Sequence, residues 1–294
     1  NHRGELAPLA AMTSPDVAVI TCVAPAHLSG FGDLQGVADE KGAILESLGT
    51  DGIAVLNADD DFFETFKSQA PGRIVSFGLS AEAEVRGSGV ALNPDGTEFD
   101  LPDGSHVKLP LPGVHNVLNA LAAVATVSVL GVSFPQAAER LGRTAPLHMR
   151  SRLLRLGGLL LLEDCYNANP ASFLAALQAL DNLGDHRKVV VAGDMAELGS
   201  HSERHHRALG TEIAGRGIEL VVAVGPESRL VSEAASQSSA RVESRHYMDA
   251  ASAAAALPEM LREGDAVLVK GSRSMGLEVV VDALVAAFDR GEGA

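Results

Sequence analysis

Residues 159–170 of this chain read LLLLEDCYNANP, and the sequence on either side is organised around this stretch. Four consecutive leucines predict a buried strand, and Glu163 and Asp164 follow where that strand must end. Pro170 then opens an alanine-rich run with the composition of a helix. Ligands of open α/β sheets bind beyond the carboxyl ends of the strands, so the intervening polar residues are candidates for a binding site. An ordinary loop in which Asn and Asp cap the helix explains them equally well.

The same alternation of strand and helix continues to the end of the chain. Strands are predicted at residues 188–192, 220–224, 243–247 and 266–269, and helices at residues 171–183, 202–216, 250–262 and 278–288. This order predicts a doubly wound, mostly parallel sheet. No G-x-G-x-x-G follows any of these strands, so the fingerprint of dinucleotide binding is absent.

The first half of the chain predicts a second α/β unit. Residues 16–23 and 52–56 read as strands, and helical spacing over residues 34–48 places Lys41 within an apolar stripe. That lysine is either a snorkelling side chain with a buried stem, or one with a lowered pKa or a covalent modification. Residues 73–111 alternate with a period of two between turn signals and predict an antiparallel meander.

Polar residues mark the start of the next helix and the segment that follows it. A helix that begins after Pro112 and Gly113 is apolar except near its start, where His115, Asn116 and Asn119 need partners from the core or from a ligand. Residues 143–152 are polar and basic, so we place the domain boundary between residues 147 and 148. Arg150 and Arg152 then either bridge the two domains or lie in an exposed linker.

Composition excludes several classes of protein. The chain has 294 residues, 46% of them hydrophobic, which is enough for two domains with cores of their own. Its net charge of −15 argues against a nucleic-acid partner and against an anionic membrane. Cys22 and Cys165 are too few for a disulfide framework and indicate a reducing compartment, which we take to be the cytoplasm. The chain begins without methionine or a targeting segment, which we interpret as a start in mid-domain.

Polar clusters follow several of the predicted strands, at His27 and at residues 57–60, 164–169, 194–197 and 270–273. Carboxylates suit Mg²⁺, and arginine and lysine suit phosphate. These groups predict an enzyme that acts on nucleotide phosphates or activates a carboxylate. The sequence offers no Ser-His-Asp order, zinc-spaced Cys/His set or nucleophile elbow.

Several runs of residues together resemble the Mur ligases, and most closely the MurF family, which adds D-alanyl-D-alanine to UDP-N-acetylmuramoyl-tripeptide. The runs are NHRGEL (1–6), APAHLSGFG (24–32), GVADEKGAI (36–44), VLNADD (55–60), LPLPGVHNVLNALAA (109–123), EDCYNANP (163–170), VAGDMAELG (191–199) followed by His206, and LVKGSRSMG (268–276). The resemblance implies part of a P-loop-type central domain with a β meander (residues 1–147) and a Rossmann-like C-terminal domain (residues 148–294). The family's Walker A loop and UDP-binding domain have no counterpart here, so we expect a truncated enzyme that cannot turn over alone.

The resemblance also implies a role for individual residues. Glu5, His27 and a carbamylated Lys41 would hold Mg²⁺, and Lys41, His27 and Arg150 would be catalytic, with Arg152 as the rival of Arg150. ATP would be bound by His115, Asn116, Asn119, Arg150, Asp164 and Asn167. The substrates would contact Tyr166, Asn169, Lys270, Ser272 and Arg273. Asp194, Glu197 and His206 would belong either to this site or to the structural framework.

The implied reaction is the ATP-dependent formation of an amide bond through an acyl phosphate, catalysed by a monomer. Two alternatives stay open. One is another amino acid ligase of the Mur superfamily, which would use a different acceptor. The other is a nucleotide-binding fragment without catalysis, since the Walker A loop is absent.

Overall fold

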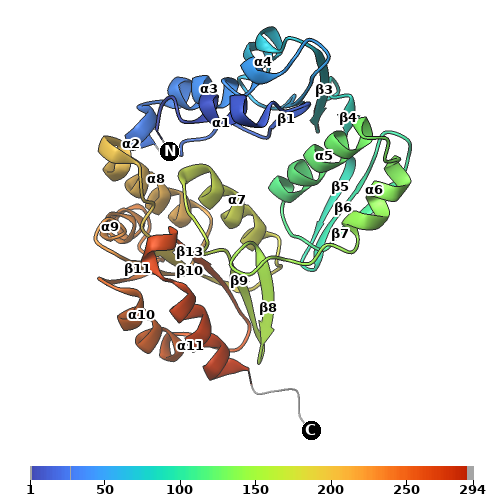
Figure 1. Cartoon of the computed structure of the whole chain (residues 1–294). Helices are drawn as coiled ribbons and strands as arrows, with labels where there is room; N and C mark the ends of the chain where they lie inside the picture. Colours follow the sequence, from blue (N-terminus) through green and yellow to red (C-terminus); the bar gives the residue numbers. More distant parts are fainter. Residues whose placement is uncertain (1, 27, 290–294) are drawn as a thin grey trace. The chain divides into compact units, whose positions relative to one another are not determined.

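The leucine run at residues 159–162 lies in β9 (Leu159–Glu163), a fully buried strand of a six-stranded sheet. The computed structural model describes residues 2–26 and 28–289, and the chain divides into two units between Ala145 and Pro146 (Figure 1). Each unit has its own sheets and its own hydrophobic core. Among the described residues, no helix is both long and apolar enough to cross a membrane.

The sheet of the second unit has the strand order β12-β11-β10-β13-β9-β8. Its other strands are β8 (Arg152–Leu156), β10 (Arg187–Gly193), β11 (Leu220–Val224), β12 (Glu243–Tyr247) and β13 (Asp265–Lys270). All pairs are parallel except β8 with β9, which run antiparallel at one edge. Because β13 returns between β10 and β9, the loops after these three strands come together at one edge of the sheet.

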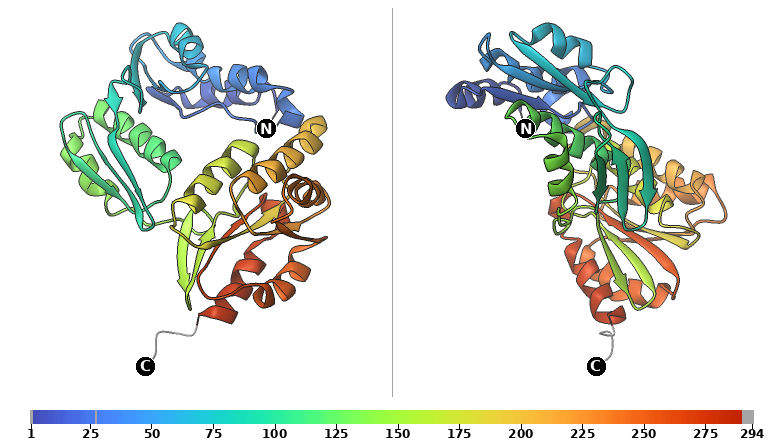
Figure 2. Two further views of the ribbon diagram at one scale, coloured as in Figure 1. Left: turned by 180° about the vertical axis from the view of Figure 1, so that it is seen from behind. Right: turned by 90° about the vertical axis from the view of Figure 1, so that its right-hand side faces the viewer.

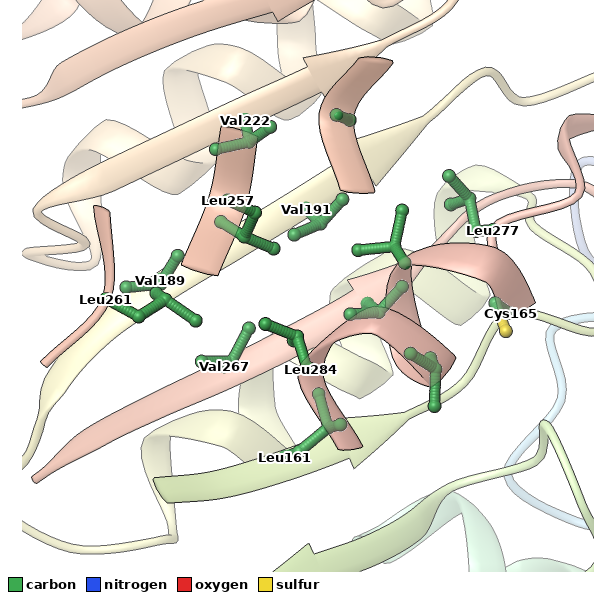
Figure 3. Packing of buried hydrophobic residues seen from close by; sticks show 14 of the residues in the cluster. Leu161, Cys165, Val189, Val191, Val222, Leu257, Leu261, Val267, Leu277 and Leu284 are labelled. Carbon is green, nitrogen blue, oxygen red and sulfur yellow. The ribbon is translucent and has the colours of Figure 1, made fainter. Parts of the chain in front are cut away.

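Helices cover both faces of this sheet (Figure 1). One face carries α7 (Pro170–Asp181), α8 (Ser202–Gly215) and α9 (Arg229–Ser238), and the other carries α10 (Ala250–Ala256) and α11 (Glu278–Phe288). Alternate strand residues such as Leu161, Val191 and Val267 pack with Leu284 of α11 in a buried cluster (Figure 3). Burial on both faces explains why these strands are continuous apolar runs. The predicted doubly wound, mostly parallel sheet is confirmed.

The first unit is built on a four-stranded parallel sheet. Its strands are β1 (Val17–Ile20), β2 (Ile53–Asn57), β3 (Arg73–Gly78) and β4 (Val85–Arg86), in that order. Helix α5 (Val114–Val129) packs on one face. The other face is covered by α3 (Leu34–Gly42), the 3₁₀ turn η1 (Leu45–Ser47) and α4 (Phe63–Gln69). The remaining helices of this unit are α1 (Leu6–Thr13), α2 (Leu28–Phe31) and α6 (Phe134–Leu141).

The predicted antiparallel meander covers less of the chain than expected. It comprises β5 (Ser88–Asn93), β6 (Gly96–Asp100) and β7 (His106–Leu109), teal in Figure 2, and it packs beside α5 and α6. The prediction for residues 73–86 was wrong, because β3 and β4 belong to the parallel sheet. The last four residues of β3 are all buried, as expected for a strand that is covered on both faces.

Two other predictions need correction. The helix predicted over residues 34–48 ends at Gly42, and Leu45 and Leu48 follow in and after η1. They enter the same core as Ala38 of α3, so the helical spacing reflected a shared core and not one helix. The segment over residues 143–152 is also not wholly a linker, because Arg152 already begins β8.

Candidate functional site

Lys270 fixes the loop between β9 and α7 (residues 164–169, called the β9–α7 loop below). It ends β13 and is 2% exposed. Its Nζ donates to Asp164 Oδ2 at 2.6 Å, to the Asn167 carbonyl at 2.9 Å and to the Asp164 carbonyl at 3.4 Å. The ammonium also lies 5.7 Å from the centre of the Phe173 ring. These three hydrogen bonds use all three N–H donors of the lysine. Lys270 therefore orders the loop and has no donor left for a substrate.

Asp164 joins three segments of this edge. Its Oδ2 accepts from Lys270, and its Oδ1 accepts from the backbone N–H of Ser151 at 3.0 Å. The side chain is 17% exposed, so part of the carboxylate still faces solvent. Each carboxylate oxygen can accept a second hydrogen bond, so Asp164 can also receive one from a ligand hydroxyl.

Ser272, in the loop after β13, links the neighbouring loops. It is 2% exposed, and its Oγ accepts from the Ala196 N–H at 2.8 Å and lies 3.4 Å from the Ala168 carbonyl. Its own N–H donates to the Asp194 carbonyl at 3.0 Å. Ser272 therefore belongs to the framework that joins the ends of β9, β10 and β13.

The two asparagines of the β9–α7 loop use their side-chain oxygens internally. Asn169 caps α7, since its Oδ1 accepts from the Ser172 N–H at 2.8 Å while its own N–H donates to Ser172 Oγ at 3.0 Å. The Oδ1 of Asn167 accepts from the Ala168 N–H at 2.9 Å. No described residue accepts a hydrogen bond from either side-chain amide nitrogen, so both remain donors for a ligand.

Two arginines lie exposed beside the loop. The guanidinium of Arg150 lies over the Tyr166 ring, 4.1 Å from its centre, and Tyr166 is 45% exposed. Arg273 donates to Glu278 Oε1 at 2.8 Å and is 56% exposed. Both cations are accessible to an anionic ligand.

Arg152, the rival of Arg150, is engaged elsewhere. Its Nη1 lies 3.5 Å from Oε2 of Glu163, and His148 Nε2 lies 3.1 Å from Oε1 of the same carboxylate. Glu163 is fully buried, so it needs the Arg152 cation to offset its desolvation. Arg150 is thus the better placed of the two to meet a ligand.

Asp194 and His206 make their hydrogen bonds within the second unit. The Oδ1 of Asp194 accepts from both the N–H and the hydroxyl of Ser228, at 2.7 and 2.6 Å, ahead of α9. His206 is fully buried, and its Nε2 accepts from the Met195 N–H at 3.0 Å. Its Nδ1 therefore carries the proton and donates to the Ser202 carbonyl at 2.9 Å. Glu197, in the same loop, has a left-handed backbone with φ 61°.

Cys165, within the β9–α7 loop, is buried and chemically quiet. Burial, followed by the nearby carboxylates of Glu163, Glu278 and Asp164, raises the pKa of its thiol from 9.0 to about 12. Since the thiolate is the reactive form, Cys165 is not a nucleophile here.

In the first unit, Lys41 is half-buried, and its Nζ donates to the Cys22 carbonyl at 2.5 Å, just beyond β1. Glu5 accepts from the backbone N–H of His2 at 3.0 Å and lies 3.0 Å from its Nδ1. His27, the third predicted metal ligand, lies outside the described residues. Within residues 2–26 and 28–289, no three His, Cys, Asp or Glu side chains are grouped as a metal site. Glu5 and an unmodified Lys41 alone supply too few oxygen ligands for a Mg²⁺ centre.

Sequence reasoning missed Glu40, which precedes Lys41. Its carboxylate accepts from the backbone N–H groups of Gly4 at 2.6 Å and Leu6 at 2.7 Å, and so fixes the segment that carries Glu5. The only sequence signal was its place next to Lys41 in the GVADEKGAI run.

Asn57, the last residue of β2, and Asp60 brace the segment just beyond β1. Asn57 donates to the Thr21 carbonyl at 2.9 Å, and Asp60 accepts from the Val23 N–H at 2.6 Å. These side chains hold backbone groups of the neighbouring loop, which is a structural role.

The three polar residues at the start of α5 differ in their partners. Asn116 is 9% exposed and donates to the Pro112 carbonyl at 2.8 Å, so it stabilises the turn before the helix. His115 is half-buried and Asn119 is exposed. Among the described residues Asn119 has no side-chain hydrogen-bond partner, and it is the one most clearly free to bind a ligand.

Comparison with known proteins agrees with this arrangement. Residues 1–127 match the model of the Mur ligase middle domain, and residues 149–273 match that of the Mur ligase glutamate ligase domain. The UDP-N-acetylmuramoyl-tripeptide--D-alanyl-D-alanine ligase of Escherichia coli is 38% identical over 292 residues, covering 97% of this chain and 63% of the relative. The Bacillus subtilis enzyme of the same name is 30% identical, with 96% and 62% covered. The chain thus spans less than two thirds of the length of these relatives.

Solved structures show the same fold. A crystal structure of MurF from Acinetobacter baumannii has a TM-score of 0.87 at 31% identity and covers 97% of this chain and 63% of its own. MurF ligase from Thermotoga maritima, in complex with ADP, has a TM-score of 0.84 at 25% identity, with 97% and 65% covered. Because two consecutive Mur ligase domains match in this order, and their fold is reproduced in both units, the chain belongs to the Mur ligase family.

Proposed function

We propose that this chain takes part in an ATP-dependent ligase reaction of the MurF kind, in which D-alanyl-D-alanine is joined to UDP-N-acetylmuramoyl-tripeptide for cell-wall peptidoglycan. The observation that carries the proposal is the similarity to the Escherichia coli enzyme of that name, which covers 97% of this chain. The ADP complex of the Thermotoga maritima relative supports a nucleotide as a ligand.

The proposed chemistry has two steps. A carboxylate oxygen of the tripeptide attacks the γ-phosphorus of ATP, and ADP leaves, which gives an acyl phosphate. The amine of D-Ala-D-Ala then attacks the acyl carbon, and the tetrahedral intermediate expels inorganic phosphate and leaves an amide. Neither step needs a protein nucleophile, so catalysis consists of positioning and charge stabilisation.

The residues of the second unit take complementary parts in this scheme. Arg150 and Arg273 supply exposed positive charge for phosphate oxygens. Asp164 accepts a hydrogen bond from a ribose hydroxyl, and the amide nitrogens of Asn167 and Asn169 donate to the acyl phosphate or the incoming dipeptide. Lys270 and Ser272 hold these groups in place, so their proposed role changes from substrate contact to positioning.

In the first unit, Asn119 and His115 are proposed to lie against the adenine. Mg²⁺ is proposed to accompany ATP and to neutralise the triphosphate, with Glu5, His27 and a carbamylated Lys41 as its holders. We further propose a cytoplasmic monomer that binds no nucleic acid, in line with the net charge of −15.

The test is a chimera in which this chain replaces the matching part of the Escherichia coli relative. Phosphate release is followed with ATP and UDP-N-acetylmuramoyl-tripeptide, with D-Ala-D-Ala added or withheld, and the 294-residue chain alone is assayed in parallel. Release that requires D-Ala-D-Ala supports the proposal. Release only with another amino acid identifies a different Mur ligase, and nucleotide binding without release with any acceptor identifies a non-catalytic protein.

A further inference from the structure

The backbone around Arg150 is strained on both sides. Met149 has φ 65° and Ser151 has φ 45°, and both are in the left-handed region that residues other than glycine rarely adopt. Each such residue costs about 1 kcal/mol or more, and the conformation persists only where surrounding contacts impose it.

Those contacts come from the second unit itself. The Met149 side chain is 6% exposed and belongs to the core cluster that includes Leu161 and Leu277. The Met149 carbonyl accepts from the Tyr166 N–H at 3.0 Å, and the Ser151 N–H donates to Asp164 Oδ1 at 3.0 Å. The backbone before and after Arg150 is therefore fixed to the β9–α7 loop.

The Arg150 side chain is held by a different kind of contact. Its guanidinium lies 4.1 Å from the centre of the Tyr166 ring, and it has no carboxylate partner among the described residues. Arg152 and Arg273, by contrast, pair with Glu163 and Glu278. A ring face attracts a cation through its quadrupole without neutralising it and leaves the N–H groups free for an anion.

We propose that Tyr166 is a positioning residue for Arg150. The ring face holds the guanidinium, still fully charged, where it meets phosphate oxygens of the nucleotide, and the phenol hydroxyl is not required. This proposal rests on the proposed ligase function, and it assigns Tyr166 to the orientation of Arg150 in place of direct contact with the dipeptide.

The kinetic test uses the chimera and two substitutions. Tyr166→Phe keeps the ring face and should stay within about twofold of the unsubstituted kcat/KM for ATP. Tyr166→Leu keeps apolar volume without a ring and should lower kcat/KM for ATP about fivefold, as expected for the loss of an exposed cation–π contact. In an Arg150→Ala background, Tyr166→Leu should have no further effect. Equal losses in the Phe and Leu variants, or a full Leu effect without Arg150, would overturn the proposal.

A spectroscopic test on the 294-residue chain needs no turnover. The ring that lies against the Arg150 guanidinium is that of Tyr166, at 4.1 Å from its centre, so this ring is the expected source of a shift. The Nε–H resonance of Arg150, assigned through Arg150→Ala, should be shifted upfield by the ring, retain the shift in Tyr166→Phe and lose it in Tyr166→Leu. Tyr247→Phe is the matched control and should leave it unchanged. An unshifted resonance overturns only the positioning role of Tyr166. A shifted resonance together with an inactive chimera overturns the ligase function on which the positioning role rests.

Discussion

At the scale of single residues, the β9–α7 loop is stabilised by the contacts that compensate the burial of the Lys270 ammonium. A lysine that is 2% exposed has lost nearly all its hydration, and only its three hydrogen bonds and the Asp164 carboxylate offset that loss. Removing the ammonium would leave Asp164, itself only 17% exposed, without its counter-ion. Stability and the geometry of the site therefore depend on the same contact.

We expect Lys270→Met to lower the free energy of unfolding by about 3–5 kcal/mol, because it leaves a mostly buried carboxylate uncompensated. Adding Asp164→Asn should recover part of the loss, since it removes the stranded charge. Lys108, exposed on β7, gives the matched control, and Lys108→Met should change stability by at most about 0.5 kcal/mol. Chemical denaturation followed by circular dichroism measures all three, and equal effects of the two lysine substitutions would contradict the account.

Residue types alone could identify this edge but could not assign its roles. The substrate contacts of Asn169, Lys270 and Ser272 were implied only by the resemblance to the Mur ligases. The structure shows that their oxygens or N–H groups are largely used within the protein. Which group a side chain bonds to depends on how segments about 100 residues apart in the chain come together. No local sequence pattern contains that information.

At the scale of elements, the backbone of the loop after β11 passes close to the Asp194 carboxylate at Gly225. Gly225 has φ 113°, and a Cβ at this position would lie 2.5 Å from Asp194 Oδ1. That oxygen accepts the hydrogen bonds of Ser228 ahead of α9. A glycine is therefore needed both for the backbone angle and for the placement of the carboxylate.

Gly225→Ala should lower the free energy of unfolding by about 2–4 kcal/mol, because backbone strain is added to the displacement of Asp194. Gly217 is the matched control, since it has φ 69° but no atom within 4 Å of the place that an alanine methyl group would occupy. Gly217→Ala should cost only the strain, about 1 kcal/mol. Thermal unfolding midpoints of the two variants test the difference, and a milder effect at Gly225 than at Gly217 would refute the clash.

The meander carries a pH-dependent contact. His106 Nδ1 lies 2.8 Å from Asp100 Oδ1, and its Nε2 lies 3.2 Å from Glu98 Oε2. Hydrogen bonds to Asp100 first, and then to Glu98, raise the pKa of His106 above its ordinary value of 6.5. Since the folded-state pKa is the higher one, the stabilisation is complete below about pH 6.5 and is lost as pH rises through the raised pKa.

We therefore expect Asp100→Asn to lower the pKa of His106 toward 6.5, and Glu98→Gln to lower it by less. Asp61→Asn, at an exposed residue outside the meander, should leave it unchanged. An NMR titration of the imidazole measures each value. A His106 pKa that does not respond to Asp100→Asn would show that the contact does not form in solution.

The sequence predicted elements best where one signal dominated. Helix α11 runs over Glu278–Phe288 as predicted, because it begins shortly after Gly276 and its apolar spacing is uninterrupted. Helix α3 was predicted too long because Leu45 and Leu48 continue its spacing beyond Gly42 into the same core. Strand β3 was assigned to the meander because nearby turn signals obscured its burial on two faces. The first error arises where tertiary packing continues a local period, and the second where a strand that is buried on both faces was assigned a period of two.

At the scale of the whole molecule, an acidic chain is proposed to bind anionic substrates. The net charge is −15, so binding depends on a few placed cations and not on the average field. We propose that Arg150 and Arg273, beside the six-stranded sheet, are such cations, and Lys270 organises the β9–α7 loop. The fold class and the family could be predicted from the sequence, because the motifs of the family occur in order along nearly the whole chain.

Ligation by this chain is proposed to pass through an acyl phosphate. The most direct measurement uses the chimera with ATP, D-Ala-D-Ala and UDP-N-acetylmuramoyl-tripeptide whose terminal carboxylate carries ¹⁸O at both oxygens. We expect the released phosphate to contain one ¹⁸O atom, since a carboxylate oxygen becomes the bridge of the acyl phosphate. Phosphate released without ¹⁸O, or no release when D-Ala-D-Ala is present, would contradict it.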